Sequence, residues 1–215
     1  MTEEDLILII FLLGFFVLAF VVIYKLVIGA FNRTQKHFTL LGERYNLEVQ
    51  LPASNWKWIN GELPAATGNI NGWPIHVYME TKGYGKNKTT YTKFEIDIAY
   101  KQANTLWLSN DGLWAKVGKV IMNTQDIQVI DPEFNRQYVI RSNNEQFVRE
   151  LMRPMFLGKL KKTLKLGFAG CLELKEGKLY YESVIMLNND KYYHEFMQAI
   201  EGALLLAKEI KLQER

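Results

Sequence analysis

The stretch LILIIFLLGFFVLAFVVIYKLVIGAF, from Leu6 to Phe31, decides how the rest of this 215-residue chain is arranged. Lys25 is its only charged residue, and the sequence that follows it is mixed and polar. An α-helix rises about 1.5 Å per residue, so about 20 apolar residues are needed to cross the hydrocarbon layer of a membrane. The stretch therefore predicts a transmembrane helix.

A cleaved signal peptide or a buried core helix fits this apolar N-terminal stretch less well. A signal peptide has a basic start, a shorter apolar core and a small-residue cleavage site, whereas this chain opens with MTEED. A helix buried on all sides in a soluble core is seldom so uniformly apolar at a chain end. We therefore expect residues 1–31 to be a permanent transmembrane anchor.

The charges that flank the apolar stretch predict its orientation. Lys25, Arg33 and Lys36 lie on its C-terminal side, and only acidic residues lie on its N-terminal side. Because cations near a membrane segment tend to stay in the cytoplasm, we expect a single-pass protein with its N-terminus outside and its large domain inside.

The helical pattern continues beyond the apolar stretch. In FNRTQKHFTLLGERYNL the apolar residues Phe31, Phe38, Leu41 and Tyr45 repeat with helical spacing, and no proline interrupts them. One long helix is expected to end near Asn46, with its last turns forming a stalk. The apolar stripe can pack against the chain's own domain or form a seam for self-association, and the sequence leaves both open.

Turn signals and alternating residues predict a sheet in the next part of the chain. Asn71-Gly72 is a strong two-residue hairpin signal, since both turn positions need positive φ. Thr89 to Tyr100 alternates apolar and polar residues, as a half-buried strand does. We expect strands from about residue 66 to 110, with the loop TKGYGKNK joining two of them, and a further hairpin at Glu176-Gly177.

Helices are predicted between and after the strands. Ser142 and Glu145 fit a capping box for a helix that Pro154 interrupts. A final amphipathic helix begins at Asn189 or Asp190. Its expected buried stripe consists of Tyr192, Phe196, Ile200, Ala203, Ala207 and Ile210.

This order of elements predicts an α+β fold with an antiparallel sheet and packed helices, not a doubly wound parallel sheet. The 48% hydrophobic content is enough to build one core. We expect a transmembrane anchor at residues 1–31, a helical stalk at 32–46 and a single cytoplasmic α+β domain at 47–215. Residues 112–122 are ambiguous between helix and strand.

The segment IQVIDPEFNRQYVI, residues 127–140, contains the most distinctive local pattern of the soluble part. We expect a strand on each side of a turn at Asp131-Pro132. Phe134 and Asn135 follow that turn, and the second strand ends in polar residues that lead into the predicted cap at Ser142.

This pattern resembles a motif of uncharacterised bacterial membrane-anchored proteins, a domain family of unknown function. A hairpin and a terminal helix follow in the same order, so the resemblance covers about residues 66–210. Asn135 stands where the family usually has Asp. The resemblance implies an architecture and a bacterial inner membrane, not a reaction, because Asp131 as a turn-former and Phe134 as a core plug explain the motif.

Residues with reactive side chains are scattered along the sequence. His37, His76 and His194 fall on the stalk, a strand and the last helix, and none has a partner at metal-ligand spacing. Cys171, the single cysteine, excludes an internal disulfide and fits a small buried hydrophobic residue. No catalytic motif is present, so we expect a non-enzyme without cofactor, catalytic residue or metal site.

Two surface features suggest partners. One is a basic segment interleaved with apolar residues, which could lie on anionic lipid or be the solvated face of a core helix. Its cations are Arg149, Arg153, Lys159, Lys161, Lys162 and Lys165. The other is NWKWING, in which Trp56 and Trp58 could contact a protein partner or belong to the core.

Together these features predict a membrane-anchored interaction or accessory subunit of a membrane-associated complex, with a protein partner or homo-oligomer besides the lipid bilayer. The alternative is an effector that binds a small molecule or lipid and changes its oligomeric state through the anchor. A net charge of +3 is too small to indicate a nucleic-acid partner.

Overall fold

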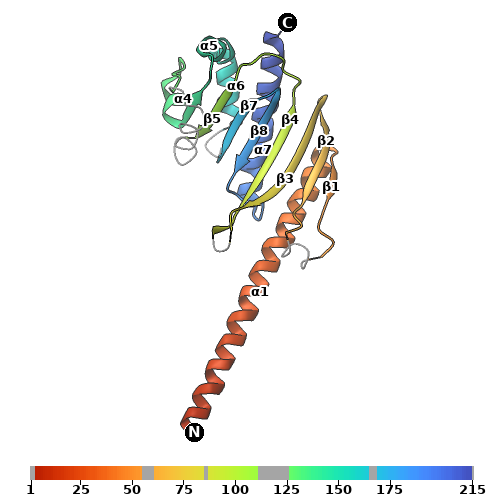
Figure 1. The fold of residues 1–215 in the computed structure, drawn as a ribbon, viewed down its shortest axis with the longest axis vertical. Coiled ribbons are helices and arrows are strands. Elements are labelled where there is room, and N and C mark those ends of the chain that lie inside the picture. Colours follow the sequence, from red (N-terminus) through yellow and green to blue (C-terminus); the bar gives the residue numbers. More distant parts are fainter. Residues whose placement is uncertain (1–2, 55–60, 85–86, 111–125, 165–168, 215) are drawn as a thin grey trace.

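The computed structural model describes residues 3–54, 61–84, 87–110, 126–164 and 169–214, and shows a long helix joined to an α+β domain (Figure 1). The domain has an eight-stranded sheet in the order β1-β2-β3-β4-β8-β7-β5-β6, in which every paired strand is antiparallel. The predicted α+β class with an antiparallel sheet is therefore confirmed.

The first helix, α1, is continuous from Glu3 to Tyr45. Asn46 ends it in the left-handed region at φ 52°, and the Leu47 amide donates to the Gly42 carbonyl at 2.9 Å, a common form of helix end. The part Ile9–Tyr45 is long and apolar enough to cross a membrane, by length and composition, and its most apolar window is not buried against the protein. The predicted single long helix and its end are confirmed.

The strands are short and joined mostly by tight turns. Their bounds are β1 Glu48–Gln50, β2 Ala65–Ile70, β3 Trp73–Lys82, β4 Thr89–Asp97, β5 Leu106–Asn110, β6 Tyr138–Arg141, β7 Cys171–Lys175 and β8 Lys178–Ser183. The two predicted hairpin turns are present: Asn71-Gly72 joins β2 to β3, and Glu176-Gly177 joins β7 to β8, all four residues with positive φ.

One face of the sheet forms the core, as a single row of paired residues demonstrates. Cross-strand partners in this row run from β1 to β6 in the order Val49, Ala66, Val77, Phe94, Tyr181, Leu172, Leu108 and Ile140. All but Val49 are buried. Because side chains alternate along a strand, the neighbouring residues point to the opposite face, which is polar.

The remaining helices are α4 Pro132–Gln137, α5 Glu145–Leu151, α6 Pro154–Leu164 and α7 Asp190–Gln213. Phe196 of α7 packs edge-on against the rings of Phe94 and Tyr181 in the middle of the core row. The predicted cap Asn189 accepts from the Tyr192 amide. The predicted stripe is buried except at Tyr192, which is half-buried while Tyr193 is buried in its place.

Two local predictions were wrong. The cap of α5 is Asn144 and not Ser142, because the Ser142 hydroxyl donates to the Thr105 carbonyl of a neighbouring segment. Asp131-Pro132 does not separate two strands. It begins helix α4, with the Asp131 carboxylate accepting from the Glu133 and Phe134 amides, and residues 127–130 form no strand. The ambiguous residues 112–122 lie outside the described residues.

Candidate functional site

The apolar helix and the domain meet at a junction built around His37 of α1. His37 is buried, its Nδ1 lies 2.7 Å from the Leu187 carbonyl oxygen, and its Nε2 lies 3.0 Å from Asp190 Oδ1. Its ring stacks on Tyr193 with a centroid distance of 4.9 Å. Both oxygens are acceptors, so the two hydrogen bonds form together only when both ring nitrogens carry a proton. The hydrogen bond from His37 lowers the pKa of the Asp190 carboxyl.

Further contacts join α1 to the domain above and below His37. Arg33 Nε donates to the Asn188 carbonyl at 2.8 Å, and Arg44 pairs with Glu201 of α7 at 2.7 Å. A Cβ added at Gly42 would lie 2.3 Å from Cγ2 of Val49, so the absent side chain allows α1 to approach β1 closely.

The apolar stripe predicted on the stalk packs against the chain's own domain. Phe31, Phe38 and Leu41 are buried, and Tyr45 is packed against the core. Of the two alternatives left open by the sequence, the structure thus contains the intramolecular one, and the stripe is not available as an exposed seam. Residues 31–45 belong to the helix and to the domain core at once, so the anchor and the domain form one body.

We expect His37→Ala to lower the free energy of unfolding by about 1–3 kcal/mol, because it leaves the Leu187 carbonyl without its donor and removes a stacked ring. Arg44→Ala on the same helix is the matched control. It breaks an exposed ion pair and should cost under about 1 kcal/mol. Chemical denaturation of the full chain in detergent measures both, and equal losses would show that the buried His37 contacts do not hold the junction.

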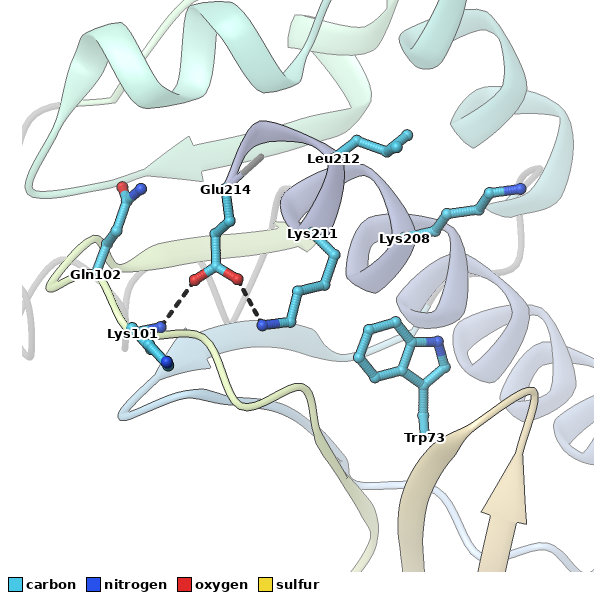
Figure 2. A pocket seen from close by; sticks show the side chains of 7 residues that line it. All are labelled: Trp73, Lys101, Gln102, Lys208, Lys211, Leu212 and Glu214. Atoms are coloured by element: carbon cyan, nitrogen blue, oxygen red, sulfur yellow. Dashed lines mark hydrogen bonds and ion pairs between the residues drawn. The ribbon is translucent and has the colours of Figure 1, made fainter.

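A cavity of about 800 Å³ lies at the other end of α7 (Figure 2). This volume is in the usual range for small-molecule sites. The start of β3, the segment after β4 and the last turns of α7 contribute to it. Its lining residues are Trp73, Lys101, Gln102, Lys208, Lys211, Leu212 and Glu214.

Glu214 occupies the middle of this cavity wall. One carboxylate oxygen accepts from the Lys101 backbone amide at 2.9 Å, and the other lies 2.5 Å from Lys211 Nζ (Figure 2). The hydrogen bond with Lys211 lowers the pKa of the Glu214 carboxyl. The cavity therefore holds a carboxylate between a backbone donor and an ammonium group, with the indole of Trp73 beside it. The sequence carried no signal for this site, since its residues lie far apart in the chain.

The polar face of the sheet carries a second cluster, in a smaller hollow of about 330 Å³. Lys93 of β4 lies 2.5 Å from Glu80 and 2.8 Å from Glu182. Burial alone would lower the pKa of Lys93, but hydrogen bonds with Glu182 and Glu80 outweigh it and raise that pKa. Lys93 is thus held protonated and is not available as a nucleophile or base.

Cys171 lies next to this cluster, paired with Glu182 across β7 and β8. The cysteine is buried, as predicted, and burial raises the pKa of its thiol. Because only the thiolate is nucleophilic, we expect Cys171 in the folded full chain to react with an aromatic disulfide reagent at least about tenfold more slowly than after denaturation. Thiol release followed by absorbance measures this. Equal rates would show that the strand pair opens freely.

The predicted basic segment is divided between α5 and α6. Lys161 Nζ lies 2.8 Å from Asp131 and 2.6 Å from Glu133. Arg149 pairs with Glu145.

The other described cations of the segment do not form a single patch with these. Arg153 donates to the Glu150 carbonyl, and Lys159 and Lys162 are exposed. α5 lies at the end of the domain remote from the N-terminus of α1 (Figure 1). Lipid contact by this segment stays a prediction, and this placement does not favour it. Lys165 lies outside the described residues.

The other predicted contact residues and the motif of the resemblance have different outcomes. Trp56 and Trp58 also lie outside the described residues, so their role in partner binding stays a prediction. Phe134 is fully buried, as a core plug. Asn135 has a structural role, since its side chain exchanges hydrogen bonds with the backbone of Val129. Within the residues that the structure describes, no three His, Cys, Asp or Glu side chains form a metal-ligand group.

The structure thus defines a class of protein: an α+β domain whose core incorporates the end of an apolar N-terminal helix. No family model matches the chain, and no curated protein matches it. The resemblance to bacterial membrane-anchored proteins therefore stays a prediction.

Among solved structures, the fold is similar to that in the crystal structure of the mycobacterial trehalose monomycolate transport factor A, TtfA. The match has a TM-score of 0.51 and covers 85% of this chain and 94% of that chain. At 8% sequence identity, the likeness shows the fold alone.

Proposed function

We propose that the chain is a single-pass bacterial membrane protein that acts as a non-enzymatic accessory subunit, with its domain on the cytoplasmic side of the inner membrane. The observation that carries this proposal is the division of α1. Its N-terminal part is apolar and exposed, whereas its end is part of the domain core. A helix of this kind holds its domain at a fixed place on the membrane surface.

The orientation rests on the cations after the apolar part. Lys25 marks the end of the uninterrupted apolar run, and Arg33 and Lys36 follow within a few turns. The structural neighbour is a protein called a transport factor, which supports an accessory role in a process at a membrane. Here we infer only this kind of role, not the cargo that its name mentions.

We assign partner binding to the polar face of the sheet. Tyr78, Tyr91 and Tyr180 are half-buried on this face, and tyrosine is enriched in protein interfaces. Tyr78 is held in place by stacking on His76, at a centroid distance of 4.7 Å. Side chains that are fixed before binding lose little conformational entropy when a partner covers them.

The test is to purify the tagged full chain in mild detergent and to identify what co-elutes. The proposal expects a protein in stoichiometric amount, and its loss from a Tyr78→Ser, Tyr180→Ser double variant that remains folded. The matched control is Lys175→Ser, an exposed residue at the end of β7. A lone chain without a partner at any salt concentration would contradict the accessory role.

The cavity at the end of α7 favours a second function, that of an effector that binds an anionic small molecule. Glu214 already places a carboxylate between the Lys101 amide and Lys211, so a ligand carboxylate or phosphate would find the same donors after displacing it. Native mass spectrometry of the detergent-purified chain separates the two functions. A bound small-molecule mass that disappears in Lys211→Glu supports the effector, and its absence supports the accessory subunit.

A further inference from the structure

The loop between β3 and β4 lies at the end of the domain where α1 enters. The two ends of β3 are marked by different contacts: Trp73 lines the cavity at the end of α7, whereas Lys82 pairs with Glu182 at 3.1 Å. Beyond Glu182, the chain runs directly to Leu187 and Asp190, which contact His37 of α1. In Figure 1 this turn points toward the N-terminal end of α1.

The strand register estimates how far the loop reaches. His76 of β3 pairs with Thr67 of β2, which pairs with Glu48, three residues after α1 ends at Tyr45. From His76 to Lys82 the strand advances about 20 Å. The same distance back along α1 corresponds to about 13 residues, which reaches the level of Asn32.

The tip of the loop extends beyond Lys82. It therefore approaches the level of Lys25, where the uninterrupted apolar run of α1 ends. If the apolar run lies in the hydrocarbon layer, the loop tip lies in the headgroup region of the same membrane.

The side chains at this tip suit such a position. Tyr84 is 95% exposed, and Lys82 and Lys88 on either side of it are exposed. Gly83 has φ 99°, and a Cβ there would lie 2.3 Å from the Asn87 carbonyl oxygen, so the turn is built around a glycine. The Asn87 amide donates back to the Tyr84 carbonyl at 3.1 Å. Tyrosine and lysine are typical of the membrane–water interface.

We propose that Tyr84, with Lys82 and Lys88, contacts the lipid headgroups of the membrane that α1 spans. The domain then has two points of attachment, the helix and this loop, which together fix its tilt over the bilayer. This inference rests on the proposed membrane anchor and adds a lipid contact to it.

The test uses spin labels on the full chain in nanodiscs of phosphatidylcholine and phosphatidylglycerol. Cys171 is buried, so single cysteines introduced at exposed positions are labelled selectively. Asn87→Cys reports on the loop, Phe16→Cys on the anchor and Leu212→Cys on the opposite end of α7. Collision with oxygen, which concentrates in lipid, is compared with collision with a water-soluble nickel complex.

We expect the oxygen-to-nickel ratio at position 87 to exceed that at 212 by at least about twofold, with the highest ratio at 16. Adding Tyr84→Ser should bring the ratio at 87 down toward the value at 212. A lipid-like ratio at 16 with equal ratios at 87 and 212 would overturn the loop contact and leave the anchor standing. A water-like ratio at 16 would overturn both.

A persistent high ratio at 87 in the Tyr84→Ser chain would show that Tyr84 is not the contact, and this too would overturn the proposal. Nanodiscs of phosphatidylcholine alone separate the two kinds of side chain. There the lysines have no anionic headgroup to bind, so a ratio that depends on Tyr84 should fall only in part.

Discussion

Phe38→Ala should lower the free energy of unfolding by about 3–5 kcal/mol, as expected for a fully buried phenylalanine. Phe38 belongs to α1 and is 0% exposed in the domain core. The substitution would therefore destabilise the domain through its anchor helix, although the helix itself stays apolar. Denaturation of the full chain in detergent, followed by near-ultraviolet circular dichroism, measures the loss.

Leu40→Ala is the matched control for this variant. Leu40 lies on the same helix but is 36% exposed, so its truncation should cost under about 1.5 kcal/mol. If Phe38→Ala were as mild as Leu40→Ala, the end of α1 would be a separate stalk, and the domain would not be built around it.

Replacing both Phe16 and Phe20 with Arg should remove the chain from the membrane. The two residues are one helical turn apart, are 66% and 71% exposed, and lie within the apolar run. Each central Arg costs about 2.5–3.5 kcal/mol on insertion scales, so two are enough to reverse a favourable insertion. Flotation of cell lysate through a sucrose gradient measures the change.

The control for this experiment is Phe16→Leu with Phe20→Leu, which keeps the run apolar and should float with the lipid. An Arg variant that floats as well as the Leu variant would contradict a transmembrane role for α1. The domain of the Arg variant should keep its fold, because its core includes α1 only from Phe31 onward.

Local patterns were enough to predict the elements whose stability is local. The long apolar run predicted α1, and Asn71-Gly72 and Glu176-Gly177 predicted two hairpins, because positive φ is required at each turn. The spacing of apolar residues predicted α7 and its cap at Asn189. In each case the residues that decide the structure lie within one or two turns of one another.

The predictions that were wrong involve contacts between distant segments. The hydroxyl of Ser142 fits a helix cap, but it is taken by the carbonyl of Thr105, so the cap moves to Asn144. At Asp131-Pro132, the capping carboxylate and the proline start a short helix, where a turn between strands was expected. Lys161, predicted to face lipid, pairs with Asp131, some thirty residues earlier in the chain.

The candidate sites were the least predictable part. The cavity joins Trp73, Lys101 and Glu214, which come together only because β4 pairs with β8 and so places α7 behind the centre of the sheet. The pair of β4 and β8 spans about half the chain, and no short-range pattern encodes it. The junction at His37 is similar, because its partners Leu187 and Asp190 follow the last strand.

An alkaline carbonate wash of membranes from cells that contain the full chain tests the central claim most directly. Such a wash releases peripheral proteins and leaves spanning helices in the lipid. If α1 crosses the bilayer, the intact polypeptide remains in the membrane pellet. Recovery of the intact polypeptide in the supernatant would contradict the claim.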